Sequence, residues 1–467
     1  MADSSVLGHP LFRNLKRFKK IEEKDRISDL PDELLSNIVA RLTLKEAITT
    51  SILSKRWADV WVSYPILDFG FLKKTYYTEI LVHRVNKVLE KFNGGKLHKF
   101  RIVHPMSERF KSHIDEWISF ATRNRVSELE LDFGGWPRHE GFDDYHVPLH
   151  VFAREEMMIL NRSSPNVRSF VSLRDLRLRS VNLSDQVFDI ILYNCSSLEN
   201  FHLRFNRGLV NAKNTAPHLK LKSLKLHDCF DLNKLELLAP NLVSFMYEGG
   251  YKVRLCIKDA PQLASLCLSV ETGLKSDMHP IFPRGKNFIF NQFSSYLPKL
   301  ESMVVSVALF EDMSNFMELC VFSNLKTLAL DANSSSIRLC CQVAAFIISA
   351  APYLELLELH LSPTRASLKE MEALELPSMS PHKNLKEVKL SGFRADVYTI
   401  DFLAYLVECT DSLQKINLSA YATDRSGDEL FVQNRLKWRA DEAENCKICV
   451  QELRKILYTN VQLIFHD

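Results

Sequence analysis

Apolar residues recur in one six-residue pattern through the middle and C-terminal parts of the chain. In each of eleven hexamers the first, fourth and sixth residues are apolar, and the residues between them are mostly polar. Side chains of a β-strand alternate between its two faces, so the pattern predicts short strands with one buried and one solvent-exposed face. The hexamers begin at Val126, Leu173, Leu198, Leu221, Leu242, Leu263, Leu300, Leu325, Leu354, Leu385 and Leu413.

The spacing of the hexamers indicates a repeat array. Starts between Leu173 and Leu263 lie 25, 23, 21 and 21 residues apart, and the later gaps are 37, 25, 29, 31 and 28. Leucine-rich repeats have periods of ~20–29 residues, and the longer gaps leave room for a helix or a loop. Because no single unit buries its apolar face alone, neighbours must stack. We therefore predict an α/β fold whose residues 97–377 form a curved leucine-rich-repeat solenoid with a concave sheet.

Two kinds of unit are distinguishable within the array. The stretches "LNKLEL" from Leu232 and "VRLCI" from Val253 fall about halfway between hexamers, which predicts a second strand in those units. By contrast, "FDIILYNCSS" and "AAFIISAAPY" precede the hexamers at Leu198 and Leu354 with continuous apolar character. These two stretches predict a helix followed by a strand.

Nearer the N-terminus the apolar period becomes helical. Leu34, Ile38 and Leu42 are spaced i, i+4, i+8, and Leu35 and Val39 lie beside them. The stripe predicts an amphipathic helix. Its Pro31 suits the first helical turn, where the missing N–H is not needed.

Two more short helices are predicted directly after this stripe. Thr43 and Glu46 have the spacing of a capping box, and Trp57 and Trp61 lie four residues apart, on one face of a third helix. A module of three short helices is near the lower size limit for independent folding. A partner that covers its exposed apolar face would stabilise it.

Composition narrows the class of protein. The chain has 467 residues, more than the ~250–300 at which a single core stops growing, so we expect several units. Its 60 Lys and Arg against 57 Asp and Glu leave a net charge of +3, whereas a nucleic-acid binder shows a basic stripe. We expect no nucleic-acid partner. No apolar segment approaches the ~18 residues of a membrane span, so we expect no membrane partner either.

The cysteines and the N-terminal segment bear on location. Most of the ten cysteines stand within apolar runs such as "LCIKDAPQLASLCLSV", where a free thiol behaves as a small buried hydrophobe. Reduced thiols predict an intracellular protein, in the nucleus, the cytoplasm or both. Residues 1–24 are expected to be a flexible mixed-charge tail, and its basic run is interpreted as solvated rather than as a nuclear address. The run comprises Lys16, Arg17, Lys19 and Lys20.

Candidate catalytic and metal sites are few. The chain contains no G-x-x-x-x-G-K-[ST], G-x-S-x-G or H-E-x-x-H motif, so we expect no catalytic residues, metal or cofactor. Cys446 and Cys449 form one C-x-x-C pair without the second pair of a structural zinc site. One segment is rich in metal-binding side chains, and we interpret it as a solvated loop. It carries His139, Asp143, Asp144, His146 and His150.

The N-terminal helices resemble an F-box. "DRISDLPDELLSNIVARLTLKEAITTSILSKRWADVWVSYPILDF", within residues 25–70, has the Leu-Pro dipeptide, the "LL-x-x-I" helix and the "LSKRW-x-x-VW" helix of that module. The repeats resemble those of plant F-box/LRR proteins, and "HKNLKEVKLSGFRADVYTIDFLAYLVECTDSLQKINLSA", within 378–467, resembles the FBD module that closes many of them. The final segment, "DELFVQNRLKWRADEAENCKICVQELRKILYTNVQLIF", departs from the family's usual basic end helix.

The resemblance implies a substrate-receptor subunit of an SCF-type cullin ubiquitin ligase. The F-box would dock on a Skp-type adaptor, which tethers it to the cullin, while the repeats hold an unknown target protein. Catalysis would lie in other subunits. The residues that match the adaptor-contact positions are Leu30, Pro31, Leu34, Leu35, Ile38, Leu53 and Trp57. The core of the three-helix unit is an equally physical place for Leu35, Val39, Leu42 and Trp61.

Two alternatives stay open at the level of sequence. The chain could be a scaffold outside any ligase, which sequesters a partner through its repeats. Some plant F-box/LRR receptors bind a small molecule in the concave face, which requires convergent arginine and aromatic side chains. Arg204, Arg254 and Arg338 lie near repeat strands, and we interpret them as solvated charges.

Overall fold

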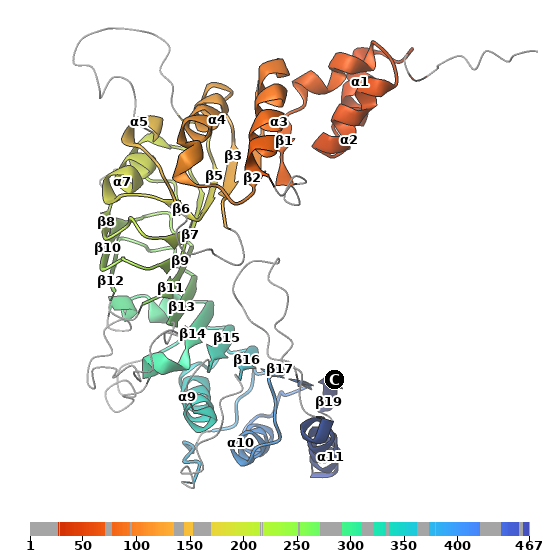
Figure 1. Cartoon of the computed structure of the whole chain (residues 1–467). Coiled ribbons are helices and arrows are strands. Elements are labelled where there is room, and N and C mark those ends of the chain that lie inside the picture. The colour runs from red at the N-terminus through yellow and green to blue at the C-terminus, as the bar shows by residue number, and fades with distance from the viewer. Residues whose placement is uncertain are drawn as a thin grey trace, which may run out of the picture.

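The chain forms a group of short helices followed by a long curved solenoid (Figure 1). This computed structural model describes residues 27, 29–70, 77–93, 96–134, 144–152, 170–214, 216, 218–250, 253–270, 292–310, 321–332, 336–361, 373–378, 380–420, 440–456 and 461–466. The predicted tail and its basic run lie outside these residues.

The solenoid is built on one parallel sheet, which has 14 strands among the described residues. Each strand pairs with the next one in the order of the chain, apart from the short strands that belong to other layers. The strands are β1 Ile66–Asp68, β2 Lys99–Val103, β3 Glu128–Asp132, β5 Asp175–Arg179, β7 Asn200–Asn206, β9 Ser223–Cys229, β11 Ser244–Gly249, β13 Ser265–Val270, β14 Ser302–Ser306, β15 Thr327–Asp331, β16 Leu356–His360, β17 Glu387–Ser391, β18 Lys415–Ser419 and β19 Gln462–His466.

The predicted repeat pattern is confirmed. Each of the eleven hexamers contributes one strand of this sheet, β3 and then β5 to β18, and its first, fourth and sixth side chains are buried. Three strands were not predicted. β1 and β19 lack the full pattern, whereas β2 has it in Leu97, Phe100 and Ile102, all of which are buried.

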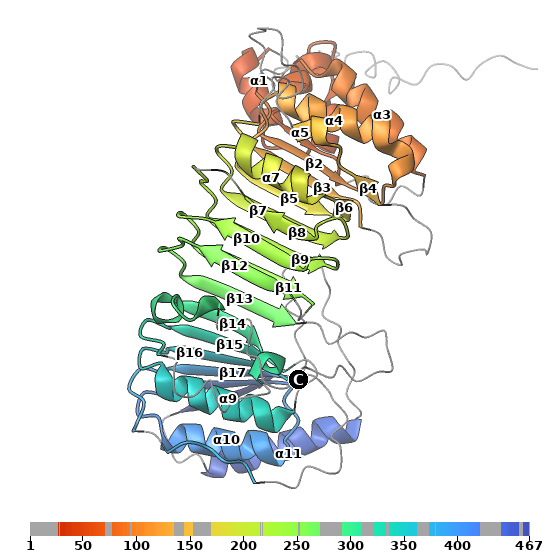
Figure 2. The same ribbon diagram turned by 90° about the vertical axis from the view of Figure 1, so that its left-hand side faces the viewer.

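A second layer covers the convex side of the sheet (Figure 2). Helices cover its two ends, and a short parallel sheet covers the middle. The helices are α3 Thr78–Lys91, α4 Lys111–Arg123, α5 Leu149–Phe152, α7 Asp185–Asn194, α9 Ile337–Ala350, α10 Val397–Glu408 and α11 Ala440–Ile456. The short sheet comprises β8 Asn211–Lys213, β10 Lys234–Leu238 and β12 Arg254–Lys258. Both predicted kinds of unit are thus confirmed: β10 and β12 are second strands, and α7 and α9 each precede a strand of the main sheet.

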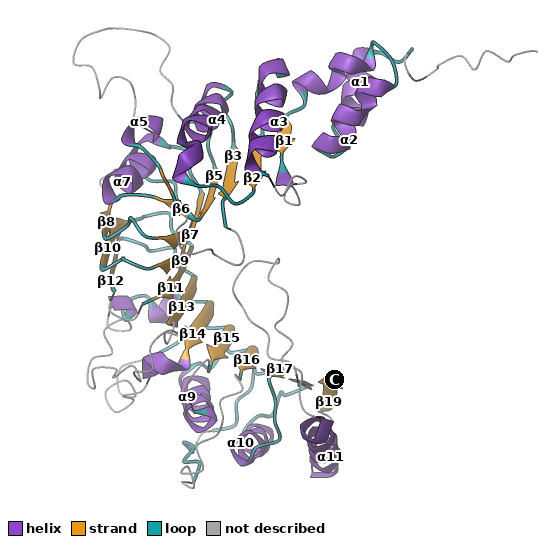
Figure 3. Ribbon diagram, viewed as in Figure 1, coloured by secondary structure: helices purple, strands orange, loops and turns teal. Residues whose placement is uncertain are grey.

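Short elements fill the remaining connections (Figure 3). They are the strand pair β4 Tyr145–His146 and β6 Val181–Asn182, and the 3-10 turns η6 Glu108–Phe110, η7 Leu297–Lys299 and η8 Val307–Phe310.

The N-terminal module contains α1 Asp32–Val39, α2 Leu44–Thr49, η3 Thr50–Ile52 and η4 Trp57–Ser63. The predicted capping box is present: the Thr43 side chain accepts from the Glu46 amide, and the Glu46 carboxylate accepts from the Thr43 amide at 2.8 Å. The third helix is a 3-10 helix. Pro31 stands at the N-cap of α1, one position before the first turn.

The sheet runs without a break from β16 to β17, across residue 377, where the sequence suggested that a C-terminal module begins. β17, α10, β18, α11 and β19 continue the same alternation of strand and helix. Structurally, this C-terminal region is the end of the solenoid.

Candidate functional site

Helix α1 divides its apolar side chains between the core and the surface. Leu35 and Val39 are buried against the module, with Leu35 at 0% exposure. Leu34 and Ile38, one helical turn apart, are 47% and 39% exposed. The stripe therefore has an inner half that holds the module together and an outer half that faces solvent.

The turn η3 adds more exposed apolar surface to the same module. Leu53, which follows η3, is 60% exposed, and Ile52 is 81% exposed. Single exposed apolar residues are ordinary on protein surfaces, but several large ones on a module this small favour a partner-binding surface. Ile52 was not among the contact residues predicted from the sequence. The stretch "TTSIL" indicates only that two apolar residues end a helix and not that both are exposed.

The other sequence-derived contact residues are placed differently. Pro31 is exposed and Leu30 is half-buried against the core. Trp57 is 2% exposed and Leu35 is fully buried, because both lie where α1 and η4 pack together. Their side chains therefore pack in the module's core, the place that the sequence already allowed for Leu35, and adaptor contact at these two positions stays a prediction.

Polar contacts hold the outer face of the module in place. Arg56 and Asp32 form an ion pair of 2.7 Å that joins the start of α1 to the start of η4. The Tyr64 hydroxyl donates to the carbonyl oxygen of Leu42. Hydrogen bonds from the backbone amide and the hydroxyl of Thr43 lower the pKa of Glu46 below its usual value, so the cap of α2 is charged at neutral pH.

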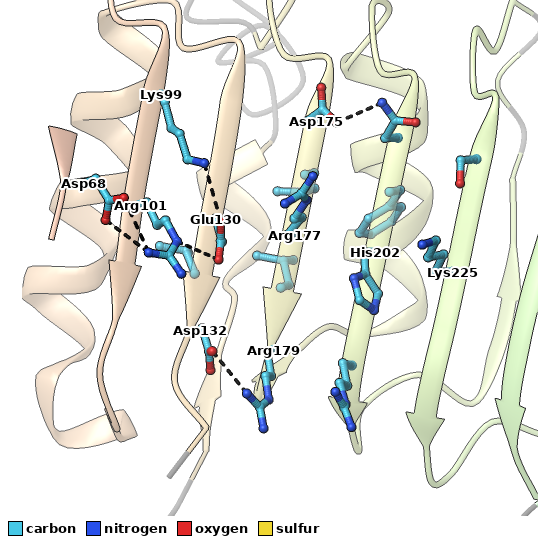
Figure 4. Close-up of a pocket in the computed structure, with 17 residues that line it drawn as sticks. Asp68, Lys99, Arg101, Glu130, Asp132, Asp175, Arg177, Arg179, His202 and Lys225 are labelled. Carbon is cyan, nitrogen blue, oxygen red and sulfur yellow. Dashed lines mark hydrogen bonds and ion pairs between the residues drawn. The ribbon is translucent and has the colours of Figure 1, made fainter. Parts of the chain in front are cut away.

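The second candidate surface is the concave face of the solenoid (Figure 4). Its outward side chains form rows, because neighbouring parallel strands are in register. The middle row runs from Asp68 on β1 through Arg101, Glu130, Arg177 and His202 to Lys225 on β9, as the strand registers require. These side chains line a hollow of about 700 Å³.

Charges in this hollow are paired on one side. On β2 and β3, the Arg101 guanidinium lies 2.8 Å from the Glu130 carboxylate and 3.3 Å from that of Asp68. In the next row, Arg179 contacts Asp132 at 3.2 Å. Figure 4 shows these contacts at the β1–β5 side, while Arg177, His202 and Lys225 follow on β5, β7 and β9.

An aromatic cluster lies at the ends of β7 and β9. The rings of Phe205 and Phe230 are stacked with centroids 6.3 Å apart. The guanidinium groups of Arg179 and Arg204 lie 5.4 Å and 4.8 Å from the Phe205 ring, within the range of cation–π attraction. This arginine–aromatic cluster was not recognised in the sequence, because its members come from three different repeats.

Next to the cluster, His227 lies between two carboxylates. Its ring nitrogens are 2.7 Å from Asp228 and 3.0 Å from Glu248. Burial disfavours the charged imidazole, but the two acidic side chains outweigh burial and raise the pKa of His227 to about 9. The imidazole is therefore charged at neutral pH and completes a compact group of charges.

The remaining sequence candidates do not form a site. Arg204, interpreted from the sequence as a solvated charge, is instead buried on β7, where its guanidinium lies over the Phe205 ring. Arg254 lies on β12 of the convex layer and Arg338 on α9, so the fold does not bring the three arginines together. Cys446 is buried in α11, and its thiol contacts the carbonyl oxygen of Phe393.

The histidine-rich segment is only partly described. His139 and Asp143 lie outside the described residues, and the described stretch holds Asp144, His146 and His150. Within the described part of the chain, no group of three or more His, Cys, Asp or Glu is arranged to hold a metal ion. Among the helices whose residues are placed, none combines the length and apolar character that crossing a bilayer requires.

Comparisons with known proteins match two parts of the chain to protein families. The F-box domain matches residues 27–69, and the family described as "At1g61320/AtMIF1, LRR domain" matches residues 88–458.

Individual relatives come from Arabidopsis thaliana. F-box/LRR-repeat protein 25 is 31% identical over 223 residues, which are 47% of this chain and 83% of that protein. Putative F-box/LRR-repeat protein At5g02930 is 26% identical over 313 residues, 65% of either chain. F-box/FBD/LRR-repeat protein At1g13570 is 24% identical over 446 residues, 89% of this chain and 96% of that one.

Proposed function

Because the chain belongs to the plant F-box/LRR family, with an F-box domain and an LRR domain of the At1g61320/AtMIF1 type, we propose that it is the substrate-recognition subunit of an SCF-type cullin ubiquitin ligase. It has no catalytic role of its own. The F-box binds a Skp-type adaptor and through it a cullin, while the leucine-rich repeats bind a target protein. The exposed apolar residues of α1 and η3 carry this proposal.

Adaptor binding follows from the way the module is built. Leu34 and Ile38 lie on one face of α1, and Ile52 and Leu53 end the next helical segment, all four exposed. Burying a Leu or Ile side chain fully stabilises a complex by roughly 1.5–3 kcal/mol. A few such residues are enough to decide whether the complex forms. We assign Pro31 and the half-buried Leu30 to the edge of the same contact.

The shape of the solenoid supports a role in target recognition. The concave sheet presents rows of outward side chains on consecutive strands, so that one target can contact many repeats at once. Holding the target in the complex raises the effective concentration of its lysines near the conjugating enzyme. The chain thus acts by positioning.

The first prediction is that L34D/I38D abolishes adaptor binding. Each substitution places a charge where an apolar contact is proposed, so the affinity for a purified Skp-type adaptor should fall at least about a hundredfold. Pull-down and calorimetry measure this change. V397D/I448D is the matched control, because Val397 and Ile448 are exposed apolar residues of α10 and α11. It should bind the adaptor like the unaltered chain.

Unchanged adaptor binding by L34D/I38D would show that α1 is not the contact. Protein turnover distinguishes the proposed receptor from the alternative, a scaffold that sequesters its partner. Partners captured by proximity labelling with the proteasome blocked should have longer half-lives when this protein is depleted. If their half-lives do not change, the chain is a scaffold and not a receptor.

A further inference from the structure

We propose that the concave face over β5, β7 and β9 binds an acidic segment of the target protein, through Arg177, His202 and Lys225. This inference rests on the proposed function only in calling the ligand a target. The binding itself depends on the side chains of these three strands and not on the F-box.

The three residues form a straight row across the sheet. Arg177 is in register with His202, and His202 with Lys225. Neighbouring strands lie about 4.8 Å apart, so the row is about 10 Å long. Arg177 is exposed, and the other two are half-buried. Figure 4 shows all three standing out from the strands on the same side.

The acidic groups beside the row, Glu130 on β3 and Asp175 on β5, are already engaged. Glu130 contacts Arg101 at 2.8 Å and Lys99 at 3.9 Å, and the carboxylate of Asp175 accepts a hydrogen bond from the Asn200 amide. Within the part of the chain that the structure describes, neither Arg177 nor Lys225 has an acidic side chain within ion-pair distance. The two cations therefore supply positive charge that the fold itself does not neutralise.

Two cations elsewhere on the sheet, Lys389 in the middle row and Lys415 in the row of Ser223, are neutralised. On β17, Lys389 contacts Glu358 at 3.1 Å, and on β18, Lys415 contacts Glu387 at 3.7 Å. The hollow over β1 to β9 is lined by six Lys or Arg and four Asp or Glu among the described residues. The excess of positive charge is thus local to the N-terminal half of the concave face.

Beyond β9 two of the rows carry no charge over the next strands, whereas the row of Arg204 and His227 continues with Glu248 on β11. The middle row continues from Lys225 to Met246 and Cys267, as the strand registers show. The row beside it carries a hydroxyl on each of five consecutive strands, at Ser223, Ser244, Ser265, Ser302 and Thr327. A ligand that crosses this face should accordingly be acidic at one end and uncharged at the other.

The arrangement suits a polypeptide better than a compact anion or a nucleic acid. The cations stand in a line and do not converge on one point, as acidic side chains spaced along an extended chain require. The face of Phe205, which could stack on a base, is already covered by Arg204.

The test uses the full chain and short fluorescein-labelled peptides, with fluorescence anisotropy as the readout. A peptide of alternating Glu and Ser followed by apolar residues should bind about tenfold more tightly than its Gln counterpart, and more weakly as salt rises. In R177Q/K225Q this preference should fall about tenfold. K386Q/K415Q changes the net charge equally, at an exposed and a half-buried lysine that already have acidic partners, and should change the affinity less than about twofold.

Three results would overturn the proposal: equal affinity for the Glu and Gln peptides, no effect of R177Q/K225Q, or an equal loss in K386Q/K415Q. A single-stranded oligonucleotide of matched charge that competes better than the acidic peptide would overturn it as well. R177Q/K225Q should still bind the Skp-type adaptor. Failure of the peptide experiment is therefore distinguishable from failure of the proposed function, which L34D/I38D tests.

Discussion

At the scale of single residues, two histidines at the same position of different repeats have opposite environments. His227 and His360 each follow the sixth residue of a hexamer. The first lies between the carboxylates of Asp228 and Glu248, which raise the pKa of His227 to about 9. The second is half-buried, with its Nδ1 hydrogen-bonded to the Ser391 hydroxyl. Partial burial, with a smaller contribution from Lys389, lowers the pKa of His360 to about 4.

His227 should stabilise the fold at neutral and mildly acidic pH. Because its folded pKa lies above the unfolded value, its contribution is complete below about pH 6.5 and is lost as pH rises through about 9. In H227Q, the free energy of unfolding should fall by about 3 kcal/mol at pH 6. The difference from the unaltered chain should shrink towards pH 10. Urea unfolding at several pH values measures it.

H360Q is the control, because its effect on pH dependence has the opposite sign. The neutral imidazole of His360 contributes most above pH 6.5, and this contribution is lost as pH falls towards 4. H360Q should therefore flatten the acid limb of the stability profile and leave the alkaline limb unchanged. If H227Q also changed only the acid limb, the charged state assigned to His227 would be wrong.

At the scale of elements, the ends of consecutive strands approach so closely that one position requires glycine. Gly392 follows β17 and has φ +74°, a conformation that costs other residues roughly 1–2 kcal/mol. A Cβ at this position would overlap the carbonyl oxygen of Leu361. The Leu361 amide in turn donates to the Ser391 carbonyl oxygen at 2.9 Å, so neither backbone can move away without breaking the ladder.

G392A should destabilise the protein by more than about 2 kcal/mol, because strain and overlap add. Thermal unfolding measures the change. G250A is the matched control, since a Cβ there meets no atom within 4 Å. A similar loss of stability in both variants would show that chain entropy, and not the close approach of β16 and β17, determines the effect.

At the scale of the whole molecule, each repeat unit of the solenoid packs against the units next to it in the chain. Strand pairing runs β7 to β9 to β11 and onward, and helices contact their neighbours, as α5 does α7 and α9 does α10. In such an array stability is a sum of units and of the interfaces between neighbours. Damage at one end should therefore not spread to the other.

The reactivity of two buried thiols can test whether unfolding at one end of the solenoid spreads to the other. Cys195 ends α7, and the Cys341 thiol on α9 contacts the Tyr398 carbonyl oxygen on α10. Burial raises the pKa of both thiols, so neither should react in the native state. F402A removes a buried ring of α10 and should speed the reaction of Cys341 with iodoacetamide, followed by mass spectrometry, while Cys195 stays protected.

F188A is the reciprocal variant. Phe188 is buried in α7 and stacks on Phe201 at 5.6 Å, so its loss should expose Cys195 and leave Cys341 protected. Each deletion of a buried ring removes roughly 3–5 kcal/mol locally. If either variant exposed both thiols equally, the solenoid would unfold as one cooperative unit and the assumption of independent ends would fail.

The sequence by itself determined the repeats, the short helices and the family, because each of these depends on residues close together in the chain. The period of the hexamers placed eleven strands, and the spacing of Thr43 and Glu46 placed a cap. Only the tertiary structure decided which side chains are accessible. It buried Leu35 and Trp57 and exposed Ile52. Among the described residues it left Arg177 and Lys225 without an acidic side chain at ion-pair distance, while Lys389 and Lys415 have one. The reason is that burial and ion pairing depend on register between strands roughly 20–30 residues apart, which no local pattern encodes.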